Sequence, residues 1–253
     1  MIPRFNELVS EVHKNLEFFK AYGVPYDPQP IGFEQEKPAD YKEQLNLLQE
    51  AVACCEDCPL GSDRIRRKAK SVPGGGNPDA LVMIVGEGPG KMEERYKGSE
   101  SSYEYGFPFV GPSGDELNRI IKFLKLKRED LFITNTVRCR ATEKNGFEVK
   151  DRQPSITEID ACQPFLIKQI ELVQPWIIIA AGKPAACSLL KLGLHTPVSE
   201  LKDKLHNYPR DPRIKVWPTW HPAFLLRNRE EMIPTGLGLK HLKAILHKSL
   251  PKD

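Results

Sequence analysis

Three polar residues, Glu87, Asn135 and His221, each stand at the end of a short apolar run of the sequence. Runs of this length and β-branched composition predict buried strands. In an open parallel sheet the carboxyl ends of the strands share one edge, and ligands bind there. A carboxylate, an amide and an imidazole at that edge can orient a water, read a ligand's hydrogen-bond groups and stabilise a developing anion. Taken singly, Asn135 could cap a turn and His221 could be structural, so the prediction rests on their convergence.

Glu87 lies in a glycine-rich turn, Gly86-Glu87-Gly88-Pro89-Gly90, and Lys91-Met92-Glu93-Glu94 follows it. Glycine lets a backbone approach a ligand closely, and the carboxylate between the glycines is expected to project from the end of the strand. The turn has neither the Gly-Lys-Ser/Thr of a P-loop nor the Gly-x-Gly-x-x-Gly of a dinucleotide-binding fold. Because a strand with a Gly-Pro turn is commonly plain structure, it indicates a site only together with Asn135 and His221.

A metal site is indicated by the Cys-x-x-Cys spacing of the first two of four cysteines, Cys55, Cys58, Cys139 and Cys162. Cys139 follows the second predicted strand and Cys162 lies in the next predicted helix, so a four-thiolate site can form at one end of the sheet. Such a site suits zinc or an iron–sulfur cluster. The alternative is a redox pair with two buried thiols. Cys187 is expected in a helix core, and Cys54 competes with Cys55, which its two-residue spacing favours.

Five of the seven residues from Arg64 to Lys70 are basic: Arg64, Arg66, Arg67, Lys68 and Lys70. A run of like charges is usually a solvated face of a protein. Beside a metal cluster that fixes the loop, the same run is expected to form a ridge that contacts phosphates.

The elements that must position these residues alternate along the chain. Apolar runs predict strands at 81–85, 131–137, 176–181 and 214–219, and amphipathic periods predict helices at about 114–126, 156–173, 183–192 and 237–249. This alternation predicts a parallel sheet with helices on both faces. The polar segments 95–106 and 140–155 are expected to be surface loops.

The first part of the chain has a different character. Residues 4–22 have apolar side chains at helical spacing, a proline-bearing connector follows, and a helical period resumes at 40–54. We therefore expect an N-terminal helical extension with a linker over residues 1–40 and a functional domain over residues 41–253.

Composition limits the class of protein. The 253 residues include 37 Lys and Arg and 34 Asp and Glu, a net charge of only +3, so a nucleic-acid partner would have to be recognised by a local surface. No apolar run approaches the roughly 20 residues that span a bilayer. The N-terminus resembles neither a signal peptide nor a transit peptide. A soluble intracellular protein is expected, in which cysteines bind metal or pack in the core.

Four segments in the same order resemble the motifs of family 4 uracil-DNA glycosylases, the iron–sulfur members of their superfamily. They are Gly86-Glu87-Gly88-Pro89-Gly90, Gly106-Phe107-Pro108-Phe109-Val110-Gly111, Ile133-Thr134-Asn135 with Cys139, and His221-Pro222-Ala223-Phe224-Leu225-Leu226-Arg227. The resemblance covers about residues 50–248. It implies a three-layer α/β/α sandwich with a central four-stranded parallel sheet. It also implies a structural [4Fe–4S] cluster on Cys55, Cys58, Cys139 and Cys162, and hydrolysis of the N-glycosidic bond of deoxyuridine in DNA.

The resemblance also implies roles for single residues. Phe109 would stack on the flipped uracil, the amide of Asn135 would pair with its N3–H and O4, and Glu93 would lie near C5. His221 would donate to O2 together with backbone N–H groups of Gly86 and Gly88. Glu87 would orient the attacking water or favour the cationic sugar.

Contacts to DNA are expected from two places. Leu225, Leu226 and Arg227 would enter the space left by the flipped base, and Arg64, Arg66, Arg67 and Lys68 would contact phosphates. The expected partner is uracil-containing DNA, single- or double-stranded, bound by a monomer in the cytoplasm at the nucleoid, with no membrane partner.

Two departures from the family leave alternatives open. The 1–40 extension has no counterpart in compact members, and the segment from Arg95 to Tyr105, with Tyr96 and Tyr103, is longer than the family's link. Residues 95–113 and 136–155 hold no histidine, which argues against the related branch that traps DNA covalently. The alternatives are a relative that excises hypoxanthine or xanthine, an inactive iron–sulfur DNA-binding module, and a zinc-bound structural protein.

Overall fold

The computed structural model describes residues 37–95, 106–145 and 148–250. The predicted helix at 4–22 and the tyrosines of the 96–105 segment lie outside the described residues. By internal contacts the chain divides into two compact units, residues 1–32 and 33–253. The second unit holds every element described below.

The second unit is built on a six-stranded sheet of order β1-β3-β2-β6-β8-β7. Its central strands are parallel, which confirms the predicted four-stranded core: β3 (Phe132–Asn135), β2 (Val82–Gly86), β6 (Ile177–Ala181) and β8 (Asp211–Thr219). Two short antiparallel edge strands were not predicted, β1 (Gly75–Gly76) and β7 (His206–Tyr208). Neither carries the apolar run by which a strand is recognised in sequence, because one is Gly-Gly and the other His-Asn-Tyr.

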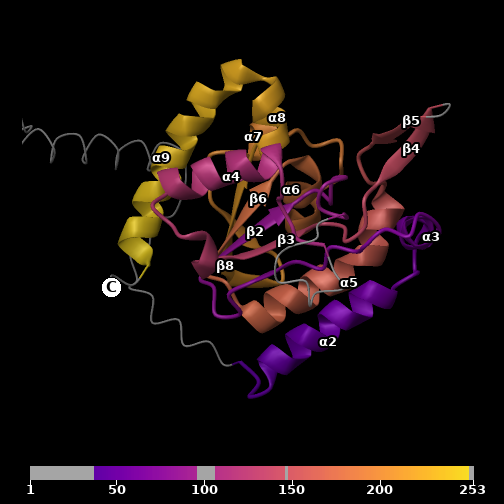
Figure 1. Ribbon diagram of the computed structural model, residues 1–253. Helices are drawn as coiled ribbons and strands as arrows, with labels where there is room; N and C mark the ends of the chain where they lie inside the picture. Colours follow the sequence, from indigo (N-terminus) through magenta and orange to yellow (C-terminus); the bar gives the residue numbers. More distant parts are fainter. Residues whose placement is uncertain (1–36, 96–105, 146–147, 251–253) are drawn as a thin grey trace, which may run out of the picture. The chain divides into compact units, whose positions relative to one another are not determined.

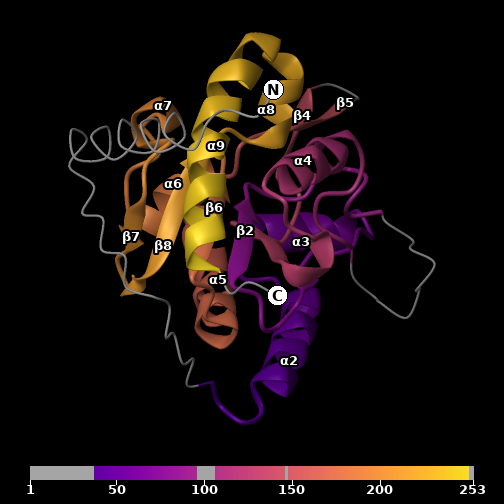
Figure 2. The same cartoon turned by 90° about the vertical axis from the view of Figure 1, so that its left-hand side faces the viewer.

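Helices cover both faces of this sheet (Figures 1 and 2). One face packs against α2 (Tyr41–Cys54), α5 (Ile156–Val173) and α6 (Lys183–Leu190), and the other against α4 (Pro112–Phe123), α8 (Pro222–Arg227) and α9 (Met232–Ser249). The shorter helices are α3 (Pro59–Arg66), η1 (Arg128–Asp130), α7 (Val198–Leu201) and η2 (Arg229–Glu231). None of the helices in the described part of the chain combines the length and apolar character that crossing a membrane requires.

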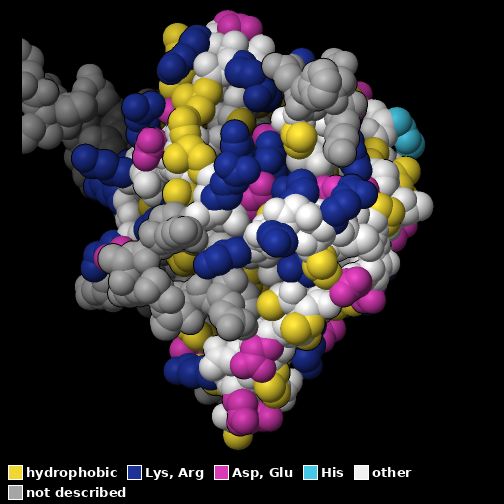
Figure 3. Space-filling view, turned by 45° about the vertical axis from the view of Figure 1, so that its right-hand side comes forward, with side chains coloured by type: hydrophobic (Ala, Val, Ile, Leu, Met, Phe, Trp, Pro, Cys, Tyr) yellow, Lys and Arg dark blue, Asp and Glu magenta, His cyan; other side chains and the backbone are white. Residues whose placement is uncertain are grey.

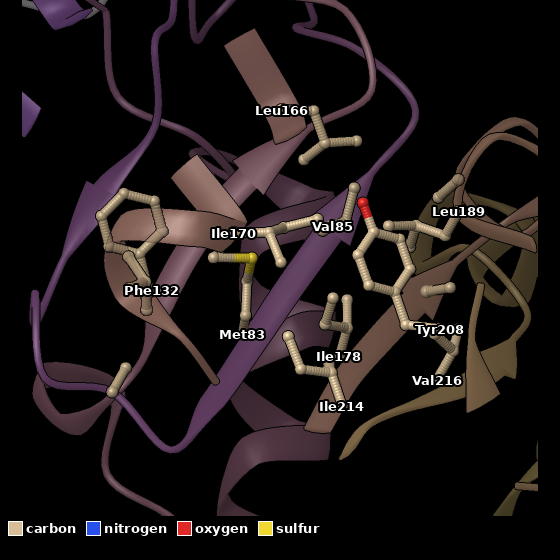
Figure 4. Packing of buried hydrophobic residues seen from close by; sticks show 14 of the residues in the cluster. Met83, Val85, Phe132, Leu166, Ile170, Ile178, Leu189, Tyr208, Ile214 and Val216 are labelled. Atoms are coloured by element: carbon tan, nitrogen blue, oxygen red, sulfur yellow. The ribbon is translucent and has the colours of Figure 1, made fainter. Parts of the chain in front are cut away.

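Alternation along β2 shows how both faces are filled. Val82 and Ile84 pack into the layer of α4 and α9, whereas Met83 and Val85 pack against the opposite layer (Figure 4). Since a parallel sheet is buried on both faces, its strands appear in sequence as continuous apolar runs. This is why the four central strands could be located from the sequence.

The segment 140–155 corrects the sequence prediction, because it is not an irregular loop. It forms a separate antiparallel hairpin of β4 (Thr142–Asn145) and β5 (Glu148–Asp151). Its strands are polar, and Glu143 stands opposite Lys150, a cross-strand pair of opposite charge. A hairpin without an apolar face carries no period that marks it in sequence.

Leu242 and Leu237 of α9 offer a matched test of this packing, since Leu242 is fully buried and Leu237 is 62% exposed. Leu242→Ala is expected to lower the free energy of unfolding by about 2–5 kcal/mol, because it removes buried surface and leaves a cavity. Leu237→Ala is expected to change it by less than about 0.5 kcal/mol. Denaturant unfolding followed by circular dichroism measures both, and equal losses would contradict the assigned face of α9.

Candidate active site

A cavity of about 660 Å³ lies where the parallel strands end. Its lining includes Glu87 after β2, Asn135 at the end of β3, Lys183 after β6 and His221 after β8. The structure thus brings together the three polar residues on which the sequence prediction rested. Phe109, Glu93 and Gly88 line the same cavity. A volume of this size lies within the range of small-molecule binding sites.

Asn135 is the most deeply placed polar group of the cavity, with 1% of its surface exposed. It lies beside Gly86 in the parallel register of β2 and β3. A Cβ at position 86 would lie 2.4 Å from Asn135 Oδ1 and 2.6 Å from Phe109 Cζ, so only glycine fits there. Asn135 Nδ2 is buried and has no hydrogen-bond partner among the described residues. Since buried donors are nearly always paired, this amide is set up for an acceptor that a ligand brings.

The loop that carries Glu87 is fastened to the chain beyond Asn135. Thr136 donates to the carbonyl oxygen of Gly86 from both its backbone nitrogen and its hydroxyl, each at 2.8 Å. The backbone nitrogen of Val137 donates to the carbonyl oxygen of Glu87 at 3.2 Å. Hydrogen bonds that extend past the end of β3 therefore tie the backbone at Glu87 to the segment that follows Asn135.

Glu93 joins this loop to the loop of Phe109. Its carboxylate accepts hydrogen bonds from the backbone N–H groups of Gly90 and Phe109. Burial raises the pKa of Glu93, although these N–H groups act in the opposite direction. Phe109 has a left-handed backbone, with φ of 54°, a costly conformation for an aromatic residue. Arg128 holds the same loop by donating to the carbonyl oxygen of Pro108 at 2.9 Å.

His221 begins α8 as its N-cap, and its Nδ1 accepts a hydrogen bond from the backbone nitrogen of Ala223 at 3.1 Å. An accepting Nδ1 carries no proton, so the proton of the neutral ring is on Nε2. Burial, aided by the positive charge of Arg227, lowers the pKa of His221 to about 4. The ring stacks against Phe109, with 5.6 Å between the centroids. At neutral pH, His221 therefore offers an uncharged N–H donor.

Glu87 is half-buried at the same cavity. Burial raises the pKa of its carboxyl group, while the positive charges of Lys183 and Arg227 act to lower it. A carboxylate with a raised pKa is a stronger proton acceptor than an exposed one.

Comparison with known proteins assigns the family. The model of the Uracil DNA glycosylase superfamily matches residues 73–248. A type-4 uracil-DNA glycosylase of Saccharolobus solfataricus is 36% identical over 191 residues, which are 74% of this chain and 79% of the relative. Those of Sulfurisphaera tokodaii and Thermotoga maritima are each 34% identical, over 74% of this chain and 77% and 86% of the relatives. The chain belongs to the type-4 uracil-DNA glycosylase family.

One residue of the segment expected to enter the space left by a flipped base is not available for that role. Leu225 is 2% exposed and packs in the core beneath α8, so it is not available as a wedge. Leu226 is half-buried and Arg227 is exposed. Leu225, Leu226 and Arg227 are consecutive in α8, and a helix points consecutive residues to different sides. The sequence motif alone does not show which of the three faces the core.

The basic run is also less available than expected. Arg64 is 6% exposed and donates to the carbonyl oxygen of Cys55 at 3.0 Å, so it supports the cysteine loop and does not face solvent. Arg67 pairs with Asp63 and Glu94. Arg66 is exposed and pairs with Asp63, and Lys68 is exposed.

The four cysteines expected to act as metal ligands lie around one small cavity. Its lining includes all four predicted ligands, Cys55, Cys58, Cys139 and Cys162. Burial raises the pKa of the Cys139 thiol to about 12, against the positive charge of nearby Arg64. Cys54 is exposed, whereas Cys187 is buried on α6, as predicted for a core residue. Within the described residues, no group of three His, Cys, Asp or Glu side chains is placed to hold a metal ion.

Other residues of the cavity were not predicted, among them Ser113, Lys183 and His195. Lys183 had a signal in the sequence, because it follows the strand of β6 just as Glu87 follows that of β2. Ser113 and His195 come from segments that no strand pattern marks.

The protonation state of His221 can be measured directly. We expect its ring to stay neutral from pH 7 down to about pH 5, because burial sets its pKa near 4. Titration of the ring carbon protons by NMR, with the signal assigned by its loss in His221→Gln, tests this. A midpoint near 6.5, the ordinary value, would contradict the buried setting.

Proposed function

We propose that this protein removes uracil from DNA by hydrolysing the bond between the base and its deoxyribose, which leaves an abasic site for repair. Membership of the family supports the reaction class. The observation that carries the proposal is the buried, unpartnered amide nitrogen of Asn135 in a cavity that also holds Glu87 and His221.

Uracil must leave the base stack to enter this cavity. Flipping costs a few kcal/mol, least for a mispaired or single-stranded base. Asn135 Nδ2 then donates to O4, and its Oδ1 accepts from N3–H. Cytosine presents the reverse donor and acceptor order, so it would leave buried groups unpaired. Phe109 supplies an aromatic surface for the ring, and Glu93, held by its two backbone bonds, closes the wall near C5.

Breaking the C1′–N1 bond moves its electron pair onto uracil, which leaves as an anion with charge on O2. The Nε2–H of neutral His221 donates to that oxygen, supported by backbone N–H groups of the Gly86–Gly88 turn. A neutral donor suits this task, because it stabilises the anion without first having to take a proton from solution.

The sugar left behind is electron-poor at C1′ and is attacked by water. We assign Glu87 to orient this water and accept its proton, since burial raises the pKa of its carboxyl group and, unlike at Glu93, no backbone N–H group of the described residues acts to lower that pKa. Its negative charge also favours the cationic sugar. Burial raises the pKa of this carboxyl group, and the positive charges of Lys183 and Arg227 oppose that rise and favour the ionised form.

Phosphate contacts in this proposal come from exposed basic residues. Arg227 at the end of α8, with Arg66 and Lys68 beside the cysteine loop, would hold the backbone, and Leu226 would cover the gap left by the base. The substrate is uracil-containing DNA, single- or double-stranded, acted on by a monomer in the cytoplasm at the nucleoid.

We assign the four cysteines to a structural [4Fe–4S] cluster. The donor set fits, because four thiolates are the usual ligands of such clusters and all four line one cavity. The backbone nitrogen of Arg138 donates to Cys162 Sγ at 3.3 Å, a bond that stabilises a thiolate.

Single-turnover excision of uracil from single-stranded DNA, with alkaline cleavage of abasic sites, tests the function. His221→Ala is expected to slow excision by about 10²–10³, the usual effect of removing one donor to a developing anion. His247→Ala, in the exposed last turn of α9, is the matched control. A loss below about threefold for His221→Ala would remove this residue from the chemistry.

The alternatives are separated by substrate. Oligonucleotides that carry uracil, hypoxanthine or xanthine are compared under the same conditions, and faster release of a purine would overturn the assignment of Asn135. Tight binding without any abasic product would instead identify an inactive DNA-binding module.

The assignment of a [4Fe–4S] cluster predicts how much iron and sulfide the purified protein holds. Protein purified without oxygen is expected to hold about four iron and four sulfide per chain and to be brown. Cys139→Ser is expected to lose both, whereas Cys54→Ala and Cys187→Ala keep them. Zinc at about one ion per chain would contradict the cluster.

A further inference from the structure

A second cavity, of about 610 Å³, lies next to the first and is lined mainly by basic residues. Its lining comprises Arg67, Lys68, Ala69, Lys70, Lys91, Glu94, Arg95, Arg140 and Val149. Lys91 and Arg95 are exposed, and no part of the mechanism above uses them. Lys and Arg side chains gather on the face of the molecule seen in Figure 3, with few acidic side chains among them.

The two cavities share a wall that is one residue thick. Gly90 and Glu93 line the first cavity, and their neighbours Lys91 and Glu94 line the second. Likewise, Ala141 lines the first cavity and its neighbour Arg140 lines the second. Because neighbouring residues of one turn line both cavities, a DNA strand that delivers a base to the first cavity would run close to the second.

The charge of the second cavity suits an anion. Six basic residues and one acidic residue line it. Two further carboxylates, Asp63 and Asp151, pair with its arginines. With these carboxylates included, basic residues still outnumber acidic ones by three. The ion pairs thus engage Arg67 and Arg140, while Lys91 and Arg95 are exposed at the cavity.

Ion pairs and a backbone hydrogen bond join the segments that line the second cavity. Glu94 is 2% exposed, and its carboxylate accepts from Arg67 at 2.7 Å and from Arg140 at 3.1 Å. Its carbonyl oxygen accepts from the backbone nitrogen of Lys70 at 3.2 Å. Arg67 Nη2 is buried without a hydrogen-bond partner among the described residues. This is a second donor group that lacks an acceptor beside a cavity.

We propose that this second cavity binds a phosphodiester of the uracil-bearing strand close to the flipped nucleotide, with Lys91 and Arg95 as its main new contacts. The proposal rests on the function proposed above and assigns it a strand-holding site that is separate from base recognition. A set of N–H donors with surplus positive charge fits a phosphate. Because this cavity adjoins the one proposed to take the base, the phosphate would belong to the DNA strand that carries the uracil.

Binding of uracil-free single-stranded DNA at several salt concentrations, followed by fluorescence anisotropy, tests the site. Lys91→Gln with Arg95→Gln is expected to reduce the slope of log Kd against log salt by about 1.4, because each lost phosphate contact to a single strand removes about 0.7. The control combines Lys122→Gln and Lys127→Gln, two exposed lysines near the end of α4 and before η1. A slope equal to that of the control would overturn the proposal.

DNA with a single neutral methylphosphonate at successive positions around the uracil then locates the phosphate. One position near the uracil is expected to weaken binding to the wild-type protein at least threefold and to have no effect on the Lys91/Arg95 variant. Equal weakening of both proteins at every position would also overturn the proposal. Because both assays measure binding and not excision, their outcome stays distinguishable from failure of the glycosylase assignment.

Discussion

Two buried carboxylates on consecutive residues, Glu93 and Glu94, hold the loops of the whole site. Glu93 lines the first cavity and Glu94 lines the second. Glu93 accepts backbone N–H groups of Gly90 and Phe109, and Glu94 accepts the guanidinium groups of Arg67 and Arg140. A buried carboxylate is costly unless it is fully paired. The pairing of these two fixes three other chain segments, around Arg67, Phe109 and Arg140, to one short turn.

The constraint explains how Phe109 keeps a left-handed backbone. Its N–H is engaged by Glu93 and its carbonyl oxygen by Arg128 at 3.3 Å. A Cβ on Gly114 would lie 2.0 Å from that carbonyl oxygen, so the start of α4 is packed directly onto the strained residue. Strain of this kind persists only where the surroundings over-determine it. Here it presents an aromatic ring to the cavity before any ligand arrives.

Apolar periodicity in the sequence predicted the central strands. The prediction failed for elements and contacts that depend on pairing between polar residues, some of them distant in the chain. The four parallel strands, and with them the shared position of Glu87, Asn135 and His221, followed from runs that must be buried on both faces. The hairpin of β4 and β5 did not, because its pairs are polar. Arg67 belongs to a run of positive charge, yet one of its partners, Glu94, is 27 residues away, and no local pattern reports such a partner.

Arg138 connects the cysteine cavity to Asn135. Its backbone N–H donates to Cys162 Sγ, while its guanidinium donates to the carbonyl oxygen of Asn135 and to Gln169 Oε1. It is 1% exposed, and in the described part of the chain no carboxylate pairs with it. A buried guanidinium needs a counter-charge. Burial lowers the pKa of Arg138, and negative charge at Cys162 and Cys139 acts to raise it. Thiolates that ligate the proposed cluster would supply that charge, so the cluster would stabilise the arginine that contacts Asn135 and would thereby contribute to the pocket.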